Sequence, residues 1–205
     1  ALSLEACNTS SVQSASIIAQ SVSSGQAPSV IFAQRTSNNA NTERMRINED
    51  GYVTKLNQPR ALVKINSTTT IANGKVTNWA SPIFNVASLW DGTNSRFVAP
   101  TAGLYMIGGN FRIGAPRKIR VVRFNIHAIN TSGTTMAIYG GGVGGTQDYD
   151  NGSGGYDHPY VSFTNVIYLQ ANQYLELHLA EVATQNTSYI QVNNEQSHLW
   201  CVLLQ

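Results

Sequence analysis

Residues 96–107 read Arg-Phe-Val-Ala-Pro-Thr-Ala-Gly-Leu-Tyr-Met-Ile, and this stretch decides the fold. Pro100 and Gly103 bracket a turn, because proline fixes φ and lacks a backbone donor, while glycine permits tight entry into the next strand. The residues expected on the core face are Phe97, Tyr105 and Ile107. The stretch therefore predicts a turn that leads into a strand packed on a hydrophobic core.

Short runs with β-strand character lie on both sides of this stretch. Their bounds are 61–65, 103–113, 119–129, 161–169, 174–179, 189–192 and 198–204. In the run at 174–179 the leucines fall on one face and Glu176 and His178 on the other, so we expect one face of that strand to be in water. With Gly, Pro and Asn turns between the runs and no convincing helix, the sequence predicts an all-β antiparallel sandwich or jelly roll.

Composition excludes several classes of function. The chain has 205 residues, only 12% are charged, and the formal net charge is +2. This charge is too small to attract a phosphate backbone, so we expect no nucleic-acid partner. No run of about 18 apolar residues occurs, and residues 1–25 lack the pattern of a signal peptide, so we expect no membrane association. A neutral, polar surface is more typical of an extracellular or virion protein than of a cytosolic enzyme.

The N-terminal part differs from the rest in composition. Residues 1–34 carry one charged side chain, Glu5, and show only short apolar patches. Such a segment buries too little to offset the backbone entropy of fixing it. We therefore expect an extended arm at 1–41 that becomes ordered against another chain. The residues expected to anchor the arm are Ile17, Ile18, Val30, Ile31 and Phe32.

Residues 42–58 read as a strand, an Asp-Gly turn at Asp50–Gly51 and a second strand, which predicts a β-hairpin. The hairpin links the arm to a domain at 59–205.

The motif at 96–107 resembles the signature Phe-x-x-Pro-x-x-Gly-x-Tyr of the globular heads of the complement-q and tumour necrosis factor superfamily. Residues 166–177 and 197–204 are similar to two further strands of that family, so the resemblance covers about 59–205. One departure is that Asn172–Gln173 replaces the usual Gly-Asp turn. The resemblance implies a ten-stranded jelly roll that assembles as a homotrimer through an aromatic and aliphatic face.

The stretch from Arg44 to Pro59 is similar to a second pattern, the Glu-Arg-Met-Arg-Ile-x-x-x-Gly-x-Val element common in tail-fibre and other virion surface proteins of bacteriophages. The pattern is short, but it stands immediately before the complement-q-like segment. Together the two resemblances indicate a protein on the outer surface of a virion.

The glycine-rich stretch at 140–157 is expected to be a long exposed loop between strands. It lacks the Gly-Lys-Ser/Thr ending of a phosphate-binding loop and the twelfth-position Glu of an EF-hand, so we expect no phosphate or metal site. Its aromatic rings and carboxylates suit recognition of a host glycan or a partner protein. The candidate binding residues are Asp148, Tyr149, Asp150, Tyr156 and Asp157.

Basic residues gather between positions 112 and 123. They are Arg112, Arg117, Lys118, Arg120 and Arg123. A strand edge guarded by cations is the commonest explanation, and contact with an acidic capsid or glycan surface is the functional alternative.

We find no residue pattern typical of an enzyme. The histidines at 127, 158, 178 and 198 lack metal-ligand spacing. Cys7 and Cys201 stand near opposite ends of the chain and are expected to be free, buried thiols. We therefore expect no catalytic residues, cofactor or metal.

The hypothesis from sequence is a homotrimeric head decoration (cement) protein, which stabilises a bacteriophage capsid by contacting the major capsid protein through its N-terminal arm. One alternative is a trimeric tail-fibre tip, attached to tail components, that recognises a host glycan. Another is a secreted carbohydrate-binding or cytokine-like module.

Overall fold

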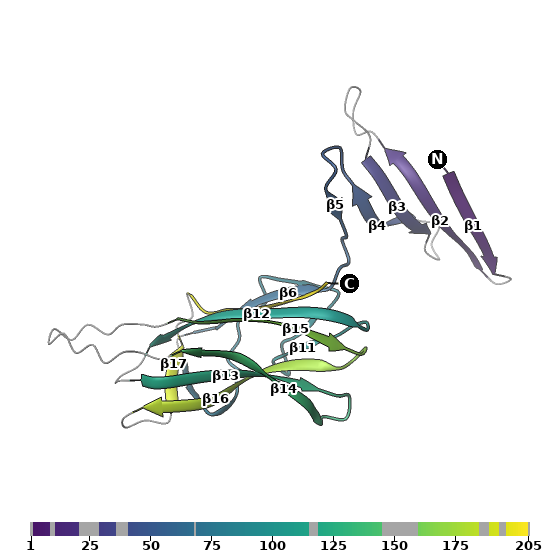
Figure 1. Ribbon diagram of the computed structural model, residues 1–205. Helices are drawn as coiled ribbons and strands as arrows, with labels where there is room; N and C mark the ends of the chain where they lie inside the picture. The colour runs from purple at the N-terminus through teal and green to yellow at the C-terminus, as the bar shows by residue number, and fades with distance from the viewer. Residues whose placement is uncertain are drawn as a thin grey trace. The chain divides into compact units, whose positions relative to one another are not determined.

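The computed structural model describes residues 2–8, 11–20, 29–35, 41–67, 69–114, 119–144, 160–184, 189–192 and 196–204. Contacts divide the chain into two compact units, Ala1–Gln58 and Pro59–Gln205. Every regular element in the described ranges is a β-strand (Figure 1). None of these residues belongs to a helix long and apolar enough to cross a bilayer.

The first unit is one antiparallel sheet in the order β1-β2-β3-β4-β5. Its strands are β1 Leu2–Asn8, β2 Ser11–Gln20, β3 Ser29–Arg35, β4 Asn41–Ile47 and β5 Val53–Thr54. The turn between β4 and β5 lies at the predicted Asp-Gly position, where Gly51 has φ 83°.

This sheet differs from the predicted extended arm. The apolar patches expected to order on another chain are paired with each other, with Ile17 opposite Phe32 and Ile18 opposite Ile31. Pairing of neighbouring strands satisfies the backbone donors and acceptors within the chain. Composition shows how little a segment can bury alone, but it does not show that several such segments align in register.

One sheet of the second unit has seven strands, in the order β7-β17-β12-β18-β6-β9, with β15 paired to β12. Its strands are β6 Arg60–Lys64, β7 Thr69–Ala72, β9 Phe84–Val86, β12 Gly103–Gly114, β15 Tyr160–Leu169, β17 Tyr189–Val192 and β18 His198–Leu203.

The other sheet has six strands, in the order β10-β11-β16-β13-β14, with β8 paired to β16. Its strands are β8 Gly74–Lys75, β10 Trp90–Asp91, β11 Arg96–Val98, β13 Ile119–Ile129, β14 Thr135–Gly144 and β16 Tyr174–Thr184. The two sheets form the two layers of a sandwich (Figure 1).

The core lies between these layers. Phe111 of β12 stacks on Phe124 of β13 with ring centroids 4.8 Å apart, and both side chains are fully buried. Trp90 packs edge-on against Phe97 at 4.9 Å. Tyr105 is buried too, and its hydroxyl donates to the carbonyl of Thr101 at 2.7 Å, which satisfies the polar end of the ring.

The glycine-rich stretch is not wholly a loop, because Gly140–Gly144 belong to β14. Glycine is needed there for close packing: a Cβ on Gly141 would lie 2.9 Å from the carbonyl oxygen of Phe124.

At the turn where Asn172–Gln173 replaces the Gly-Asp of the resembled family, Asn172 has φ 66° and takes the left-handed conformation that glycine adopts readily.

Candidate functional site

The outward side of the seven-stranded sheet is apolar over part of its length. Trp200 lies between Leu62 and Gly108 in the sheet register, and Met106 lies between Val202 and Val166. We call this surface the apolar face. Its residues are Leu62, Phe84, Leu104, Met106, Val166, Tyr168, Trp200 and Val202.

Exposure is the unusual property of this face. Leu104 is 44% exposed, Val166 52% and Tyr168 56%. Their strand neighbours Tyr105 and Ile167 point inward and are buried. An antiparallel strand with one face in water normally alternates apolar and polar residues, but here both faces are apolar. Contiguous exposed apolar surface of this kind marks a site of interaction.

Trp200 lies flat against the sheet because its neighbour has no side chain. A Cβ on Gly108 would overlap the indole ring and would come within 2.9 Å of the carbonyl oxygen of Phe163. Beside Trp200 is a hollow of about 510 Å³. It is lined by Leu62, Phe84 and Val202, with the cationic side chains of Arg60 and Lys64 also in its wall.

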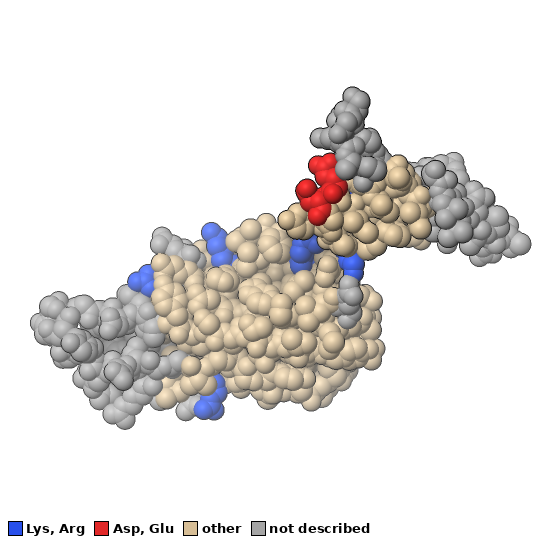
Figure 2. Space-filling view, turned by 45° about the horizontal axis from the view of Figure 1, so that its top comes forward, with Lys and Arg blue, Asp and Glu red and all other residues tan. Residues whose placement is uncertain are grey.

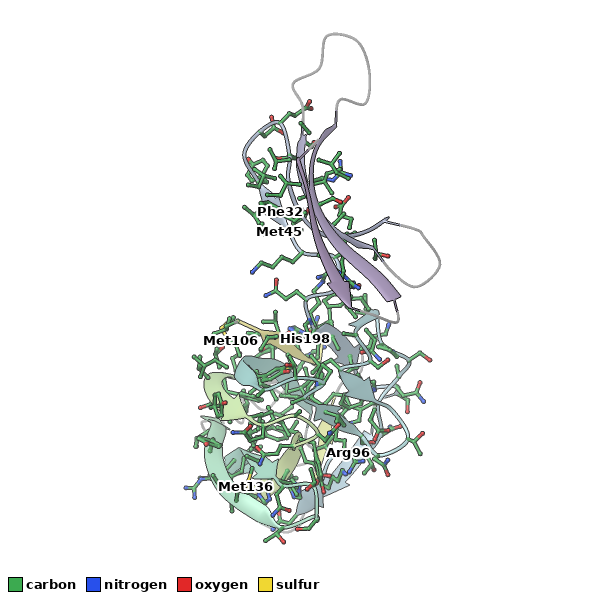
Figure 3. All side chains as sticks on the ribbon, turned by 90° about the vertical axis from the view of Figure 1, so that its right-hand side faces the viewer. Phe32, Met45, Arg96, Met106, Met136 and His198 are labelled. Carbon is green, nitrogen blue, oxygen red and sulfur yellow. The ribbon has the colours of Figure 1, made fainter. Side chains whose placement is uncertain are left out.

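The same side of the sheet becomes polar toward its other end. His198 lies between Lys64 and Asn110 in the register, and Ser162 donates to Asn110 Oδ1 at 2.6 Å. Met106 and His198 belong to this layer, whereas Met136 belongs to the other (Figure 3). The surface thus combines an apolar part with a hydrogen-bonding part, as protein interfaces do.

A cluster of titratable side chains lies on the six-stranded sheet. Lys75 Nζ is 2.5 Å from Glu176 Oε1, and His178 Nε2 is 3.2 Å from Glu176 Oε2. The rings of His127 and His178 stack with centroids 3.8 Å apart and planes 5° apart. The expectation that Glu176 faces water is wrong, because this residue is 8% exposed. Strand β8 pairs with β16 and brings Lys75 to it.

This cluster favours a neutral His127. Burial lowers the pKa of His127 below its usual value, the neighbouring His178 lowers it further, and Glu176 acts in the opposite direction. Since Glu176 already has two partners, we interpret the cluster as part of the structure of the sheet.

Among the side chains that the structure describes, we find no reactive thiol and no metal cluster. Cys201 is buried in β18, and burial raises the pKa of its thiol far above the usual range, so the nucleophilic thiolate does not form. Among the residues that the structure describes, no group of three or more His, Cys, Asp or Glu side chains could hold a metal ion.

The large side chains of the predicted turn motif lie in the core rather than at a site. Phe97, Tyr105 and Ile107 are buried in the core, Gly103 begins β12, and Pro100 is exposed in the turn before it. Their spacing therefore reports how the sandwich folds.

The predicted basic cluster is not gathered on one surface. Arg112 lies on β12 and Arg123 on β13, which belong to different sheets. Arg120 is also on β13, but its side chain lies outside the described residues, as do Arg117 and Lys118. Figure 2 shows Lys and Arg side chains at separate places in that view.

The remaining predicted sites fall in two places. The candidate binding residues Asp148, Tyr149, Asp150, Tyr156 and Asp157 lie outside the described residues. The predicted anchoring residues are in strands of the first unit, Ile17 and Ile18 in β2, and Val30, Ile31 and Phe32 in β3.

Sequence reasoning expected an aromatic and aliphatic subunit face only from the resemblance and did not name the residues of the apolar face, although a signal was present. Leu104 and Met106 alternate with Tyr105 and Ile107, so every position of this part of β12 is apolar. A strand whose inward-pointing and outward-pointing residues are both apolar needs a covering layer on each of its two faces. The sequence-based expectation considered only the inward-pointing residues Tyr105 and Ile107.

No protein-family model and no curated protein matches the sequence. Solved structures do match the fold. The Eiger tumour necrosis factor from S. frugiperda superposes with a TM-score of 0.52 at 12% identity, covering 72% of this chain and 93% of that chain. The globular domain of zebrafish complement 1qA superposes with a TM-score of 0.53 at 9% identity, covering 72% of this chain and 98% of that chain.

The chain therefore has the antiparallel β-sandwich of the complement-q and tumour-necrosis-factor-like jelly roll. At these identities the likeness extends to the fold alone.

Proposed function

We propose that this protein is a non-enzymatic, homotrimeric structural protein of a virion surface, and that the apolar face is its subunit contact. The observation that supports self-association is the exposure of Leu104, Val166 and Tyr168 on a sheet whose other side is already a complete core. Three copies are proposed because heads of the resembled superfamily assemble in threes.

The free energies of burial and of association determine how much of the apolar face must be covered. Full burial of one large apolar side chain contributes about 1.5–3 kcal/mol. Association costs about 4–15 kcal/mol in lost freedom of motion. A contact through one or two of these side chains is therefore too weak, so a stable contact must cover most of the apolar face. The hollow beside Trp200 would be filled by side chains of a neighbouring copy.

The proposed virion role rests on the stretch from Arg44 to Pro59, whose pattern is similar to that of phage surface proteins. Decoration of a capsid was favoured by an extended arm, and the first unit is instead a five-stranded sheet. This observation favours the second candidate, a tail-fibre tip. Quantitative gel densitometry of purified particles separates the two roles: many copies spread over the head indicate decoration, and few copies at the tail indicate a fibre tip.

Self-association is tested by light scattering on the purified chain, with two matched variants. Val166 and Ile138 are both β-branched, 52% and 57% exposed, and on different sheets of the sandwich. We expect the wild type and Ile138→Lys to have three times the subunit mass of 22.2 kDa, and Val166→Lys to have the mass of one subunit. A wild-type mass of one subunit, or dissociation by Ile138→Lys instead, contradicts the proposal.

A further inference from the structure

The sheet of the first unit has two faces of different chemistry. On one face, Ile17 lies opposite Phe32, which lies opposite Met45 on the next strand. Strand alternation places a second apolar row on the same face. We call both rows together the apolar rows. Their residues are Ile17, Val30, Phe32, Met45, Ile47 and Val53.

Burial of the two faces is the reverse of the usual pattern. Ser29, Ile31 and Ala33, which alternate with the apolar rows, are buried. Ile17 is 37% exposed and Val53 56%, and the other members are half-buried. Phe32 and Met45 lie side by side in Figure 3. The large apolar side chains are therefore on the more open face, whereas a sheet normally buries them.

Charge is also distributed unequally between the two faces of this sheet. Glu43 and Arg46 form an ion pair at 2.6 Å, and Arg46, opposite Ile31, is on the other face from Met45. Next to the apolar rows, Arg44 donates to Gln34 Oε1 at 3.2 Å. The six residues of the apolar rows themselves carry no charge, so like-charge repulsion between two copies of this surface is limited to the neighbouring Arg44.

We propose that the apolar rows pack against the apolar rows of other copies of this chain. A single sheet layer cannot bury an apolar face by itself, and the described residues of the first unit form only one layer. This inference rests on the proposed trimer. The chain continues directly from Gln58 into Pro59 of the second unit, so a trimer tethers three such sheets together. Short tethers give effective concentrations of about millimolar, which makes a neutral apolar contact between copies favourable.

The test is chemical cross-linking between copies of the full chain. Val53 and Thr54 are adjacent, both exposed, and on opposite faces of β5. We would prepare Val53→Cys, Ile17→Cys and the matched control Thr54→Cys in a Cys7→Ser background, because buried Cys201 does not compete for reagent. Labelling with a monofunctional maleimide establishes that all three introduced thiols react. A short bismaleimide then measures proximity between copies.

We expect covalent dimers from Val53→Cys and Ile17→Cys at a yield about tenfold or more above that from Thr54→Cys. Adding Val166→Lys to Val53→Cys should abolish the cross-link in dilute solution, because the tether to other copies is lost. A trimeric mass with equal yields at positions 53 and 54 overturns this inference and leaves the proposed trimer standing. A wild-type mass of one subunit overturns the proposed function first.

Discussion

The two units are built from the same kind of antiparallel strand but differ in what covers their apolar side chains. In the second unit, Phe111, Phe124 and their neighbours form a contiguous core between two sheets. In the first unit, Phe32 and Met45 lie on a single layer and stay half-buried. The difference shows that strand pairing sets the local structure, whereas burial of the large apolar side chains requires a second layer. That layer comes from the chain itself in one unit and, as we propose, from other copies in the other.

The largest expected effect tests the core of the second unit. Phe111→Ala should lower the free energy of unfolding by about 3–5 kcal/mol, because it leaves a cavity among packed aromatic rings. Phe32→Ala should leave the same transition in place. Tryptophan fluorescence in a denaturant titration separates the two, since Trp79, Trp90 and Trp200 are all in the second unit. Equal shifts from both variants would show that the units do not unfold separately.

An intermediate effect concerns the ion pairs of the two units. Lys75→Met should lower the free energy of unfolding by about 1–3 kcal/mol, because it leaves Glu176 buried without its closest partner. Glu43→Gln should have a smaller effect, because Arg46 and Glu43 are more open to solvent, which screens their attraction. Thermal unfolding followed by circular dichroism measures both. If Glu43→Gln lowered the free energy of unfolding as much as Lys75→Met, the difference in solvent exposure between the two ion pairs would have no effect on their contribution to stability.

The smallest expected effect is a dependence of stability on pH. Unfolded histidine has a pKa of about 6.5, and the pKa of His127 is lower than its usual value in the folded chain. The unfolded state therefore takes up a proton first as pH falls, so stability is full above about pH 6.5 and is lost as pH falls through the folded pKa. His127→Gln should flatten the pH profile of the tryptophan-monitored midpoint. All four histidines are in the second unit. If the pH profile of the midpoint is unchanged in His127→Gln, another group is responsible for the pH dependence of stability.

Sequence reasoning predicted most strands of the second unit, because period-two alternation and turn residues are local signals. The motif from Phe97 to Ile107 indicated the jelly roll, which the structure and the comparisons confirm. Strand β14 was missed because Gly140–Gly144 resemble a loop in composition. Their role depends on the approach of the Phe124 backbone, which sequence spacing does not show.

Contacts between strands that are distant in the sequence were less predictable, and they decide which side chains are buried. Burial of Glu176 depends on Lys75, which is about a hundred residues away in the chain and meets it only through pairing of β8 with β16. The sheet of the first unit depends in the same way on the register between Ile17, Phe32 and Met45. Long-range pairing of this kind is a tertiary property that single-strand patterns do not encode.

Strand β18 is synthesised after every other strand of its sheet, yet it lies between β12 and β6. A nascent chain that has not yet emerged through residues 198–203 therefore keeps open hydrogen-bonding edges on both of those strands. Such edges invite pairing with other polypeptides on the same polysome. This sheet is therefore complete only after residues 198–203 have inserted between β12 and β6.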